Sequence, residues 1–160
     1  MPLEFTFPFF RWCDRTALGE FVRGGSWQFP MIETFHILSL AVLIGTVVVV
    51  VNLRLMGVLM KGWTVSGLMT ELRPYLNWSL VVILVSGVLL FLSEAEKAFP
   101  NPAFWVKIYL LFAAIIFHYT VVVRMTKHEE VSRATGVVVG VISLILWLGI
   151  GWAGRAIAFV

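Results

Sequence analysis

Residues 31–56 read MIETFHILSLAVLIGTVVVVVNLRLM, the apolar stretch that decides the fold. Its charged residues, Glu33 and Arg54, stand near its two ends, and nearly everything between them is apolar. At roughly 1.5 Å per helical residue, the stretch is long enough to cross the roughly 30 Å of hydrocarbon in a bilayer. It therefore predicts a membrane-spanning helix.

Three further apolar stretches have the same character, and the composition agrees with them. The chain of 160 residues is 60% hydrophobic and only 13% charged, with a mean hydropathy of +0.95. Such a composition excludes an ordinary water-soluble globule. We therefore expect four spans in the chain, over about 31–56, 77–93, 104–125 and 136–153.

The connections between these spans are short, which constrains how the spans pack. Consecutive helices joined by short links lie side by side and run in opposite directions. The sequence thus predicts an all-α integral membrane protein, an antiparallel up-down four-helix bundle over residues 31–160. In the first connection, residues 57–76, glycines and Pro74 accompany mixed apolar residues, so we expect a short surface helix there.

The segment before the bundle, residues 1–30, mixes aromatic and charged side chains. Phenylalanine and tryptophan of this kind favour the level of the lipid head groups, so we expect an amphipathic segment lying in the membrane interface. Charges from Glu4 to Arg23 interrupt it too often for a signal peptide. The single cysteine, Cys13, excludes an internal disulfide, a CxxC metal pair and an iron–sulfur cluster built by this chain alone.

Basic residues collect at two of the three connections, and this asymmetry predicts an orientation. Cytoplasmic loops are enriched in lysine and arginine, so these two connections are expected in the cytoplasm and both termini outside the plasma membrane, in the periplasm of a bacterium. The bases stand at helix ends without a motif or a continuous stripe, so nucleic acid is not an expected partner. They are Arg54, Lys61 and Arg73 around the first connection, and Arg124, Lys127 and Arg133 around the third.

Two ionisable residues stand at matching depth in the first and third spans. His36 follows Met31 by five residues and Lys107 follows Phe104 by three, which places both roughly 5–8 Å below the outer boundary. Glu33 lies one turn before His36, where it can pair with Lys107 or hold the imidazole. Ionisable groups inside a span are costly, so Glu33, His36 and Lys107 together predict one outward-facing functional site.

Several kinds of chemistry fit these three residues. A five-coordinate haem b needs one neutral imidazole, here His36, and an apolar slot, and the Lys107 ammonium can bind a propionate. Copper is an alternative, although it calls for three or four donors at one depth, and only Met31 and Glu33 accompany His36. A purely structural interpretation also stands, with His36 bonded to a neighbouring helix and Lys107 paired with Glu33. Trp27 and Trp105 are expected to roof the site.

His118 and Arg54 are secondary candidates. Eleven residues separate Lys107 from His118, so the two share a helix face, but His118 lies deeper, roughly 15 Å from His36 along the bundle. That separation is too large for both imidazoles to bind one haem iron. The third histidine, His128, lies in a polar connection and is expected to be solvated. Arg54 is expected to reach the interface, or to contact His118, an anionic lipid or a substrate.

The fourth span carries small residues that permit close backbone approach. Gly136 and Gly140 are followed by further glycines and alanines up to Gly154. The stripe predicts packing within the chain, or alternatively a face for a second copy or a larger membrane complex. Ser39, Ser86, Ser93 and Ser143 are expected only as hydrogen-bonding links between helices.

Three motifs carry a resemblance to a known family: the ExxH that opens the first span, the LRLxG that closes it, and the FxxK that opens the third. Over about residues 27–128 the chain resembles an uncharacterised bacterial family of four-helix membrane proteins, itself similar to the superfamily of copper-resistance protein D and HemJ-type protoporphyrinogen oxidase. The resemblance implies that His36 and Lys107 correspond to the key histidine and lysine of the HemJ-type enzymes, which bind b-type haem. It also implies an oxidoreductase, if the protein is an enzyme.

The function predicted from these observations is that of a plasma-membrane redox protein. It would bind haem b at one outward-facing site and exchange electrons with a quinone or a protein partner. A copper-handling membrane protein is the first alternative. The second is a non-catalytic subunit that docks onto a larger membrane complex through its aromatic N-terminal segment and its fourth span.

Overall fold

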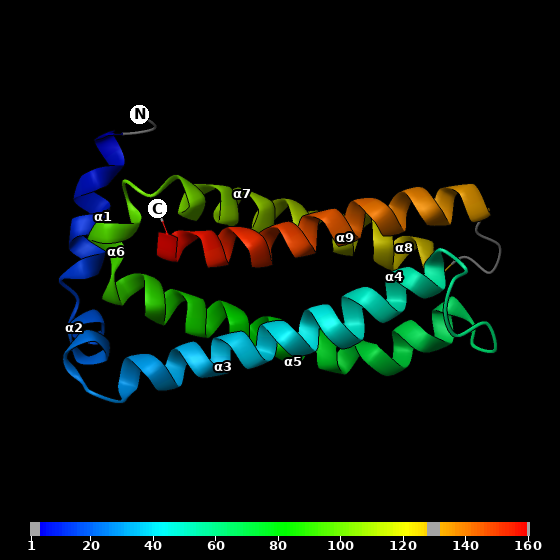
Figure 1. Cartoon of the computed structure of the whole chain (residues 1–160), viewed down its shortest axis with the longest axis horizontal. Coiled ribbons are helices and arrows are strands. Elements are labelled where there is room, and N and C mark those ends of the chain that lie inside the picture. Colours follow the sequence, from blue (N-terminus) through cyan, green and yellow to red (C-terminus); the bar gives the residue numbers. More distant parts are fainter. Residues whose placement is uncertain (1–3, 128–131, 160) are drawn as a thin grey trace.

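A computed structural model describes residues 4–127 and 132–159, and His128 lies outside these residues. Within them the chain is helical, with no strand (Figure 1). Four helices are long and apolar enough to cross a membrane, which confirms the four predicted apolar helices. The first, Gln28–Leu55, is made of α3 (Gln28–Val42), the π-helix η2 (Leu43–Val49) and α4 (Val50–Leu55), and the second is α5 (Val65–Ser93). The third, Pro102–Met125, is made of α7 (Pro102–Phe117), the π-helix η3 (His118–Val122) and α8 (Val123–Met125). The fourth, Arg133–Phe159, is made of α9 (Arg133–Ala156) and η4 (Ile157–Phe159).

The second long helix differs most from its prediction, because it begins at Val65 rather than at residue 77. The Thr64 hydroxyl caps its start by accepting a hydrogen bond from the Gly67 amide at 3.0 Å. Two residues of the expected connection, Leu68 and Met69, are buried, so their packing extends the helix through Pro74. Tertiary packing here outweighs the local signal of a proline.

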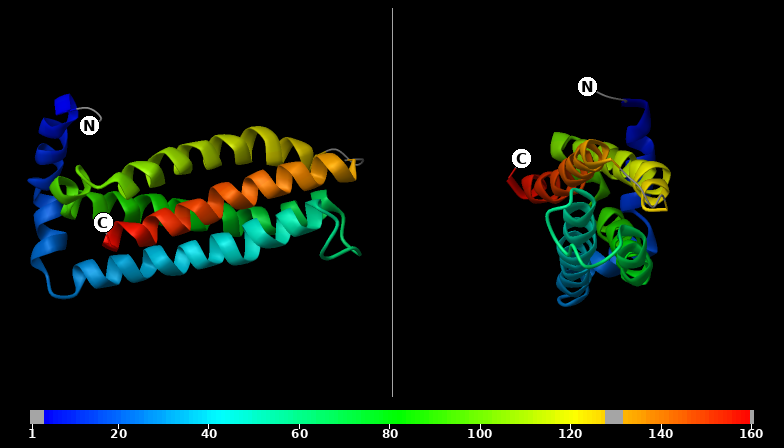
Figure 2. Two further views of the ribbon diagram at one scale, coloured as in Figure 1. Left: turned by 45° about the horizontal axis from the view of Figure 1, so that its top comes forward. Right: turned by 90° about the vertical axis from the view of Figure 1, so that its right-hand side faces the viewer.

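The four long helices associate as two pairs. The first pair is α3 with α5, and the second is α7 with α9. Seen end on, the two pairs occupy opposite sides of the molecule (Figure 2). They come together where α4 packs against α9, at the end that carries the connections before α5 and α9.

Glycines of α9 make this contact between the pairs possible. A Cβ atom added to Gly136 would collide with the carbonyl oxygen of Leu55, and one added to Gly140 would lie 3.2 Å from the carbonyl oxygen of Asn52. Beside them the amide of Asn52 donates a hydrogen bond of 3.0 Å to the Ser143 hydroxyl. The first part of the glycine stripe thus serves packing within the chain, as predicted.

The N-terminal helices lie across the other end of the long helices (Figure 1). They comprise η1 (Glu4–Thr6), α1 (Phe7–Asp14) and α2 (Ala17–Gly24). The Phe10 ring is buried and packs edge-on against Phe91 of α5 and Phe104 of α7, so α1 bridges the two helix pairs. A Cβ added to Gly19 would collide with the carbonyl oxygen of Leu92, which shows how closely α2 approaches α5.

Polar contacts fix the same segment in place. The Arg23 guanidinium donates to the Asp14 carboxylate at 2.8 Å and to the carbonyl oxygen of Ser93 at 2.9 Å. Asp14 in turn accepts a bond of 3.3 Å from the amide of Glu96, in the short helix α6 (Ala95–Ala98). Residues 4–24 are therefore joined to the long helices by side chains of both kinds, apolar and charged.

Cys13 offers a test of this docking. Its side chain is buried beside Phe10 and Ala95, and burial raises the pKa of its thiol. Because only the thiolate reacts with iodoacetamide, a raised pKa leaves less reactive thiolate at pH 8.5, where an exposed cysteine is about half ionised. We expect alkylation of Cys13, followed by mass spectrometry, to be slow at this pH in the folded protein and fast after denaturation. Equal rates in the two states would contradict the docked arrangement.

Candidate functional site

The site is built around His36, in the middle of α3. Its side chain is buried, with 9% of its surface exposed, and its Nδ1 lies 2.9 Å from the hydroxyl oxygen of Ser86 on α5. A Cβ added to Gly87 would lie 3.3 Å from Cε1 of His36. The absence of a side chain at Gly87 therefore lets the imidazole lie directly against α5.

The hydrogen bonds around Ser86 relate to the tautomer of the imidazole. The Ser86 hydroxyl donates its one proton back along the helix, to the carbonyl oxygen of Val82. When the hydroxyl donates in this direction, its oxygen accepts from the imidazole and Nδ1 carries the proton. This leaves Nε2 with a free lone pair. An imidazole whose Nδ1–H is held by a neighbouring acceptor is the usual form of a histidine that binds a metal.

Lys107 comes from the opposite helix pair. It is half-buried in α7, and its side chain lies along Gly154 of α9, where an added Cβ would be 3.6 Å from Nζ. The ammonium is close enough to His36 to act on it electrostatically. All four long helices thus contribute to this region, through His36, Ser86, Lys107 and Gly154.

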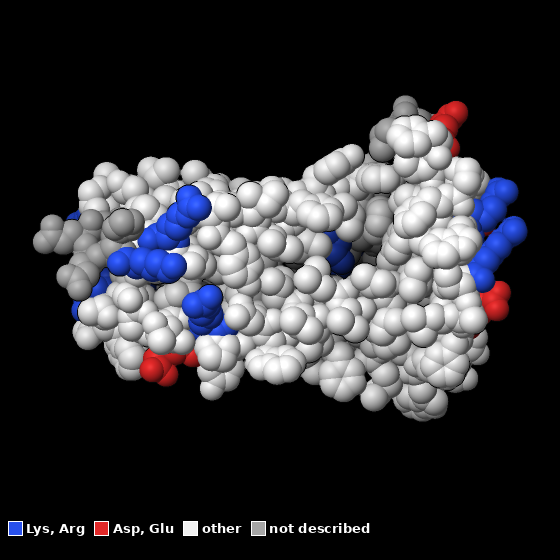
Figure 3. All heavy atoms as spheres, turned by 180° about the vertical axis from the view of Figure 1, so that it is seen from behind, with Lys and Arg blue, Asp and Glu red and all other residues white. Residues whose placement is uncertain are grey.

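The surface of the molecule is hollowed on one side. Figure 3 shows a hollow on the back of the molecule, toward the end that carries α1, with atoms of a basic side chain at its floor. Around the hollow the surface is almost free of charge. A basic group at the bottom of an apolar hollow is well placed to attract an anionic part of a ligand.

Glu33 does not join the two residues that it was expected to accompany. Its side chain is exposed, and among residues 4–127 and 132–159 no ion pair links it to Lys107. Of the expected triad the structure therefore brings together His36 and Lys107. Trp27 is 77% exposed and does not roof the site, whereas Trp105 packs against Phe10 and donates its indole N–H to the carbonyl oxygen of Phe99 at 2.9 Å.

Ser86 is the site residue to which sequence reasoning gave too small a role. It was expected only as a link between helices, but its hydroxyl oxygen lies 2.9 Å from Nδ1 of His36. A signal for it exists in the sequence: Ser79, Ser86 and Ser93 recur every seven residues and all three are buried on one face of α5. The pattern alone does not say which of the three meets the histidine.

The secondary candidates lie elsewhere. His118 is buried at the start of the π-helix η3, and its ring stands 6.3 Å from that of Trp147 on α9, nearly at right angles. No contact found in the described part of the chain joins it to His36 or Lys107. Arg54 donates a bond of 2.6 Å from Nε to the carbonyl oxygen of Trp63, so it holds the first connection against the end of α4.

Haem and copper ask for different sets of protein donors. Within the described residues no cluster of three histidine, cysteine, aspartate or glutamate side chains is suited to hold a bare metal ion. A copper ion at His36 would have to take its further donors from other residue types, such as methionine. A single imidazole is what haem b asks of a protein, because its porphyrin supplies four nitrogen ligands to the iron.

Comparison with known proteins places the chain in one family. No curated protein and no solved structure matches the sequence. Residues 9–160 match the profile of a family of unknown function, DUF6644. Because this match covers most of α1, all of α2 and the four long helices, the chain belongs to the family DUF6644.

Proposed function

We propose that the protein is an integral membrane protein whose four long helices cross the bilayer as an antiparallel up-down bundle. Each helix is long and apolar enough to do so. Many large side chains point away from the core, among them Phe112, Ile116 and Ile145, each more than 60% exposed. Lipid would cover this apolar surface, whose exposure to water would be unfavourable. The basic connections would face the cytoplasm, and α1 and α2 would cover the outer, periplasmic end of a bacterial inner-membrane protein.

We further propose that the region between His36 and Lys107 binds haem b and that the protein takes part in electron transfer. The observation that carries this proposal is the hydrogen bond between Ser86 and Nδ1, which leaves Nε2 of a buried imidazole free to bind iron. Bound haem would supply one-electron redox chemistry. The resemblance to HemJ-type proteins points to the same two residues, His36 and Lys107.

Each residue of the site would have its own role in holding the haem. His36 would bind the iron, and Ser86 would fix the plane and tautomer of its ring. The Lys107 ammonium would pair with a propionate and hold its charge within the apolar bundle. The small residues Gly87 and Gly154 would leave room beside these two side chains. A quinone from the membrane, or a protein partner at the outer surface, would exchange electrons with the site.

Spectroscopy of the purified protein tests this proposal. After expression with haem precursors, we expect the wild-type protein to show a Soret band and to contain about one haem per chain, because one imidazole, that of His36, would bind one iron. Metal analysis of the same sample distinguishes the copper alternative. A sample with stoichiometric copper and no Soret band would show that the cofactor is copper and not haem. A sample with neither cofactor, purified with a stable partner, would favour the non-catalytic subunit.

A further inference from the structure

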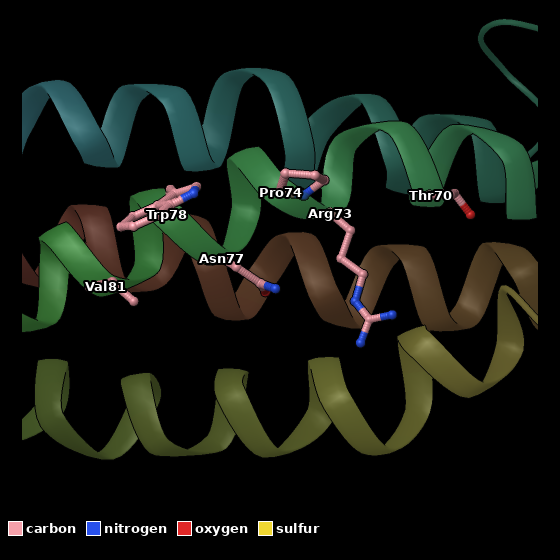
Figure 4. A pocket seen from close by; sticks show the side chains of 6 residues that line it. All are labelled: Thr70, Arg73, Pro74, Asn77, Trp78 and Val81. Atoms are coloured by element: carbon pink, nitrogen blue, oxygen red, sulfur yellow. The ribbon is translucent and has the colours of Figure 1, made fainter.

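A second candidate binding site lies on α5, at the end of the molecule opposite α1. It is a shallow, open groove of about 430 Å³ (Figure 4). Its lining residues recur at helical spacing, so they form a single face of α5. They are Thr70, Arg73, Pro74, Asn77, Trp78 and Val81.

The part of the groove formed by residues 70–77, here called its polar end, offers polar groups that can make further hydrogen bonds. Arg73 is exposed and takes part in no ion pair within the described ranges. Asn77 accepts a hydrogen bond of 2.9 Å from the Tyr119 hydroxyl through its Oδ1, which leaves its amide nitrogen as a donor. Because Pro74 has no N–H, the carbonyl of Thr70 lacks its ordinary helical partner. In Figure 4 the side chains of Arg73 and Asn77 extend from α5 toward the helix that carries Tyr119.

The position of the groove along α5 fits the head-group level of a membrane. This step rests on the proposed membrane insertion. Tyr75 and Trp78 are 62% and 71% exposed, and exposed aromatic residues of this kind mark the boundary between lipid and water. One turn further along α5 the exposed residues are aliphatic, beginning with Val81 and Val82. The groove is therefore polar and basic around Arg73 and Asn77, and apolar around Trp78 and Val81.

The charge around the groove favours an anionic occupant. Most of the described charged residues at this end of the molecule are basic, and Figure 3 shows them gathered there. At the opposite end the charges compensate one another, as in the pair of Arg23 with Asp14 at 2.8 Å. An unpaired guanidinium above an apolar surface matches a phosphate attached to an acyl chain.

We propose that this groove binds the head group of an anionic phospholipid from the adjacent leaflet. Arg73 holds the phosphate, and Asn77 donates to a phosphate or ester oxygen. The carbonyl of Thr70, which lacks its usual amide partner at Pro74, accepts a hydrogen bond from a head-group hydroxyl such as that of phosphatidylglycerol. One acyl chain lies along Trp78 and Val81. Free phosphate would contact only the polar end of the groove, around Arg73 and Asn77.

Native mass spectrometry of the detergent-solubilised protein tests the proposal. With equal amounts of phosphatidylglycerol and phosphatidylcholine, we expect the wild type to retain the anionic lipid preferentially. Arg73→Gln should lower this retention about fivefold, the effect of removing one basic residue near an anionic lipid. Arg133→Gln is the matched control, because Arg133 is an exposed base of the same end outside the groove. It should leave the preference nearly unchanged.

Three outcomes would overturn the lipid site: equal retention of the two lipids, an equal loss in both variants, or displacement of the lipid by millimolar inorganic phosphate. The haem spectrum of Arg73→Gln separates this inference from the proposed function, because the groove and His36 share no residue. If the protein fractionates with membranes and shows its Soret band but no lipid preference, the lipid site alone fails. If it is found outside membranes, the proposed membrane insertion fails with it.

Discussion

Replacing His36 by alanine should abolish the Soret band of the purified protein. His36 is the imidazole on which Lys107 acts electrostatically, and in the proposed tautomer its Nε2 is free because Ser86 accepts from Nδ1–H. Among the described residues no cluster of three histidine, cysteine, aspartate or glutamate side chains could hold a metal ion. Loss of the axial ligand therefore removes the iron's attachment to the protein. Absorption spectra and haem content per chain measure the effect.

The matched control is His118→Ala. His118 is also a buried histidine of a long helix, 4% exposed against 9% for His36, so the two substitutions remove the same group from similar surroundings. We expect His118→Ala to retain the Soret band. A band that survives His36→Ala, with unchanged position, would show that the iron is bound elsewhere. Loss of the band in both variants, with both monodisperse on gel filtration, would show that His118 belongs to the haem site.

Replacing Gly136 by valine should prevent the two helix pairs from closing. A Cβ at this position collides with the carbonyl oxygen of Leu55, which is backbone and cannot rotate away. Overpacking of this kind costs about 3 kcal/mol, and a collision with backbone offers little relaxation. We expect a much lower midpoint of thermal unfolding in detergent, or no folded protein at all.

Two other glycines of the long helices provide controls for this effect. A Cβ at Gly45 meets nothing within 4 Å, and one at Gly151 meets only Cδ1 of Ile44, at 3.6 Å. Alanine at either position should leave the unfolding midpoint within a few degrees of the wild-type value, because neither methyl group collides. If Gly136→Val unfolded at the same temperature as these variants, the close contact between α4 and α9 would be wrong.

The sequence was sufficient for the four apolar helices because length and hydropathy are properties of each stretch by itself. It failed at the start of α5, where Pro74 and several glycines suggested a connection. The burial of Leu68 and Met69 against residues distant in the sequence could not be seen there. The docking of α1 across the helix ends likewise depends on Phe10 meeting Phe91 and Phe104, which are far along the chain.

The candidate site was partly predictable for the same reason. Counting residues from the ends of two helices predicted His36 and Lys107 at a similar depth, and Lys107 acts electrostatically on His36 in the structure. Glu33 was expected beside them because it is one turn from His36, yet the rotation of α3 leaves Glu33 exposed. That rotation, and the choice of Ser86 among the three buried serines of α5, are set by packing between helices. Neither can be deduced from spacing within one helix.

The most direct test of the account is chemical rescue of the histidine ligand. In His36→Gly the imidazole is removed and a space of its shape remains beside Ser86 and Gly87. We predict that this variant, purified without a Soret band, regains the band when haem and free imidazole are added together, and that haem alone does not restore it. A wild-type band that persists in His36→Gly without imidazole, or a folded variant that imidazole fails to restore, would contradict the assignment of His36 as the ligand.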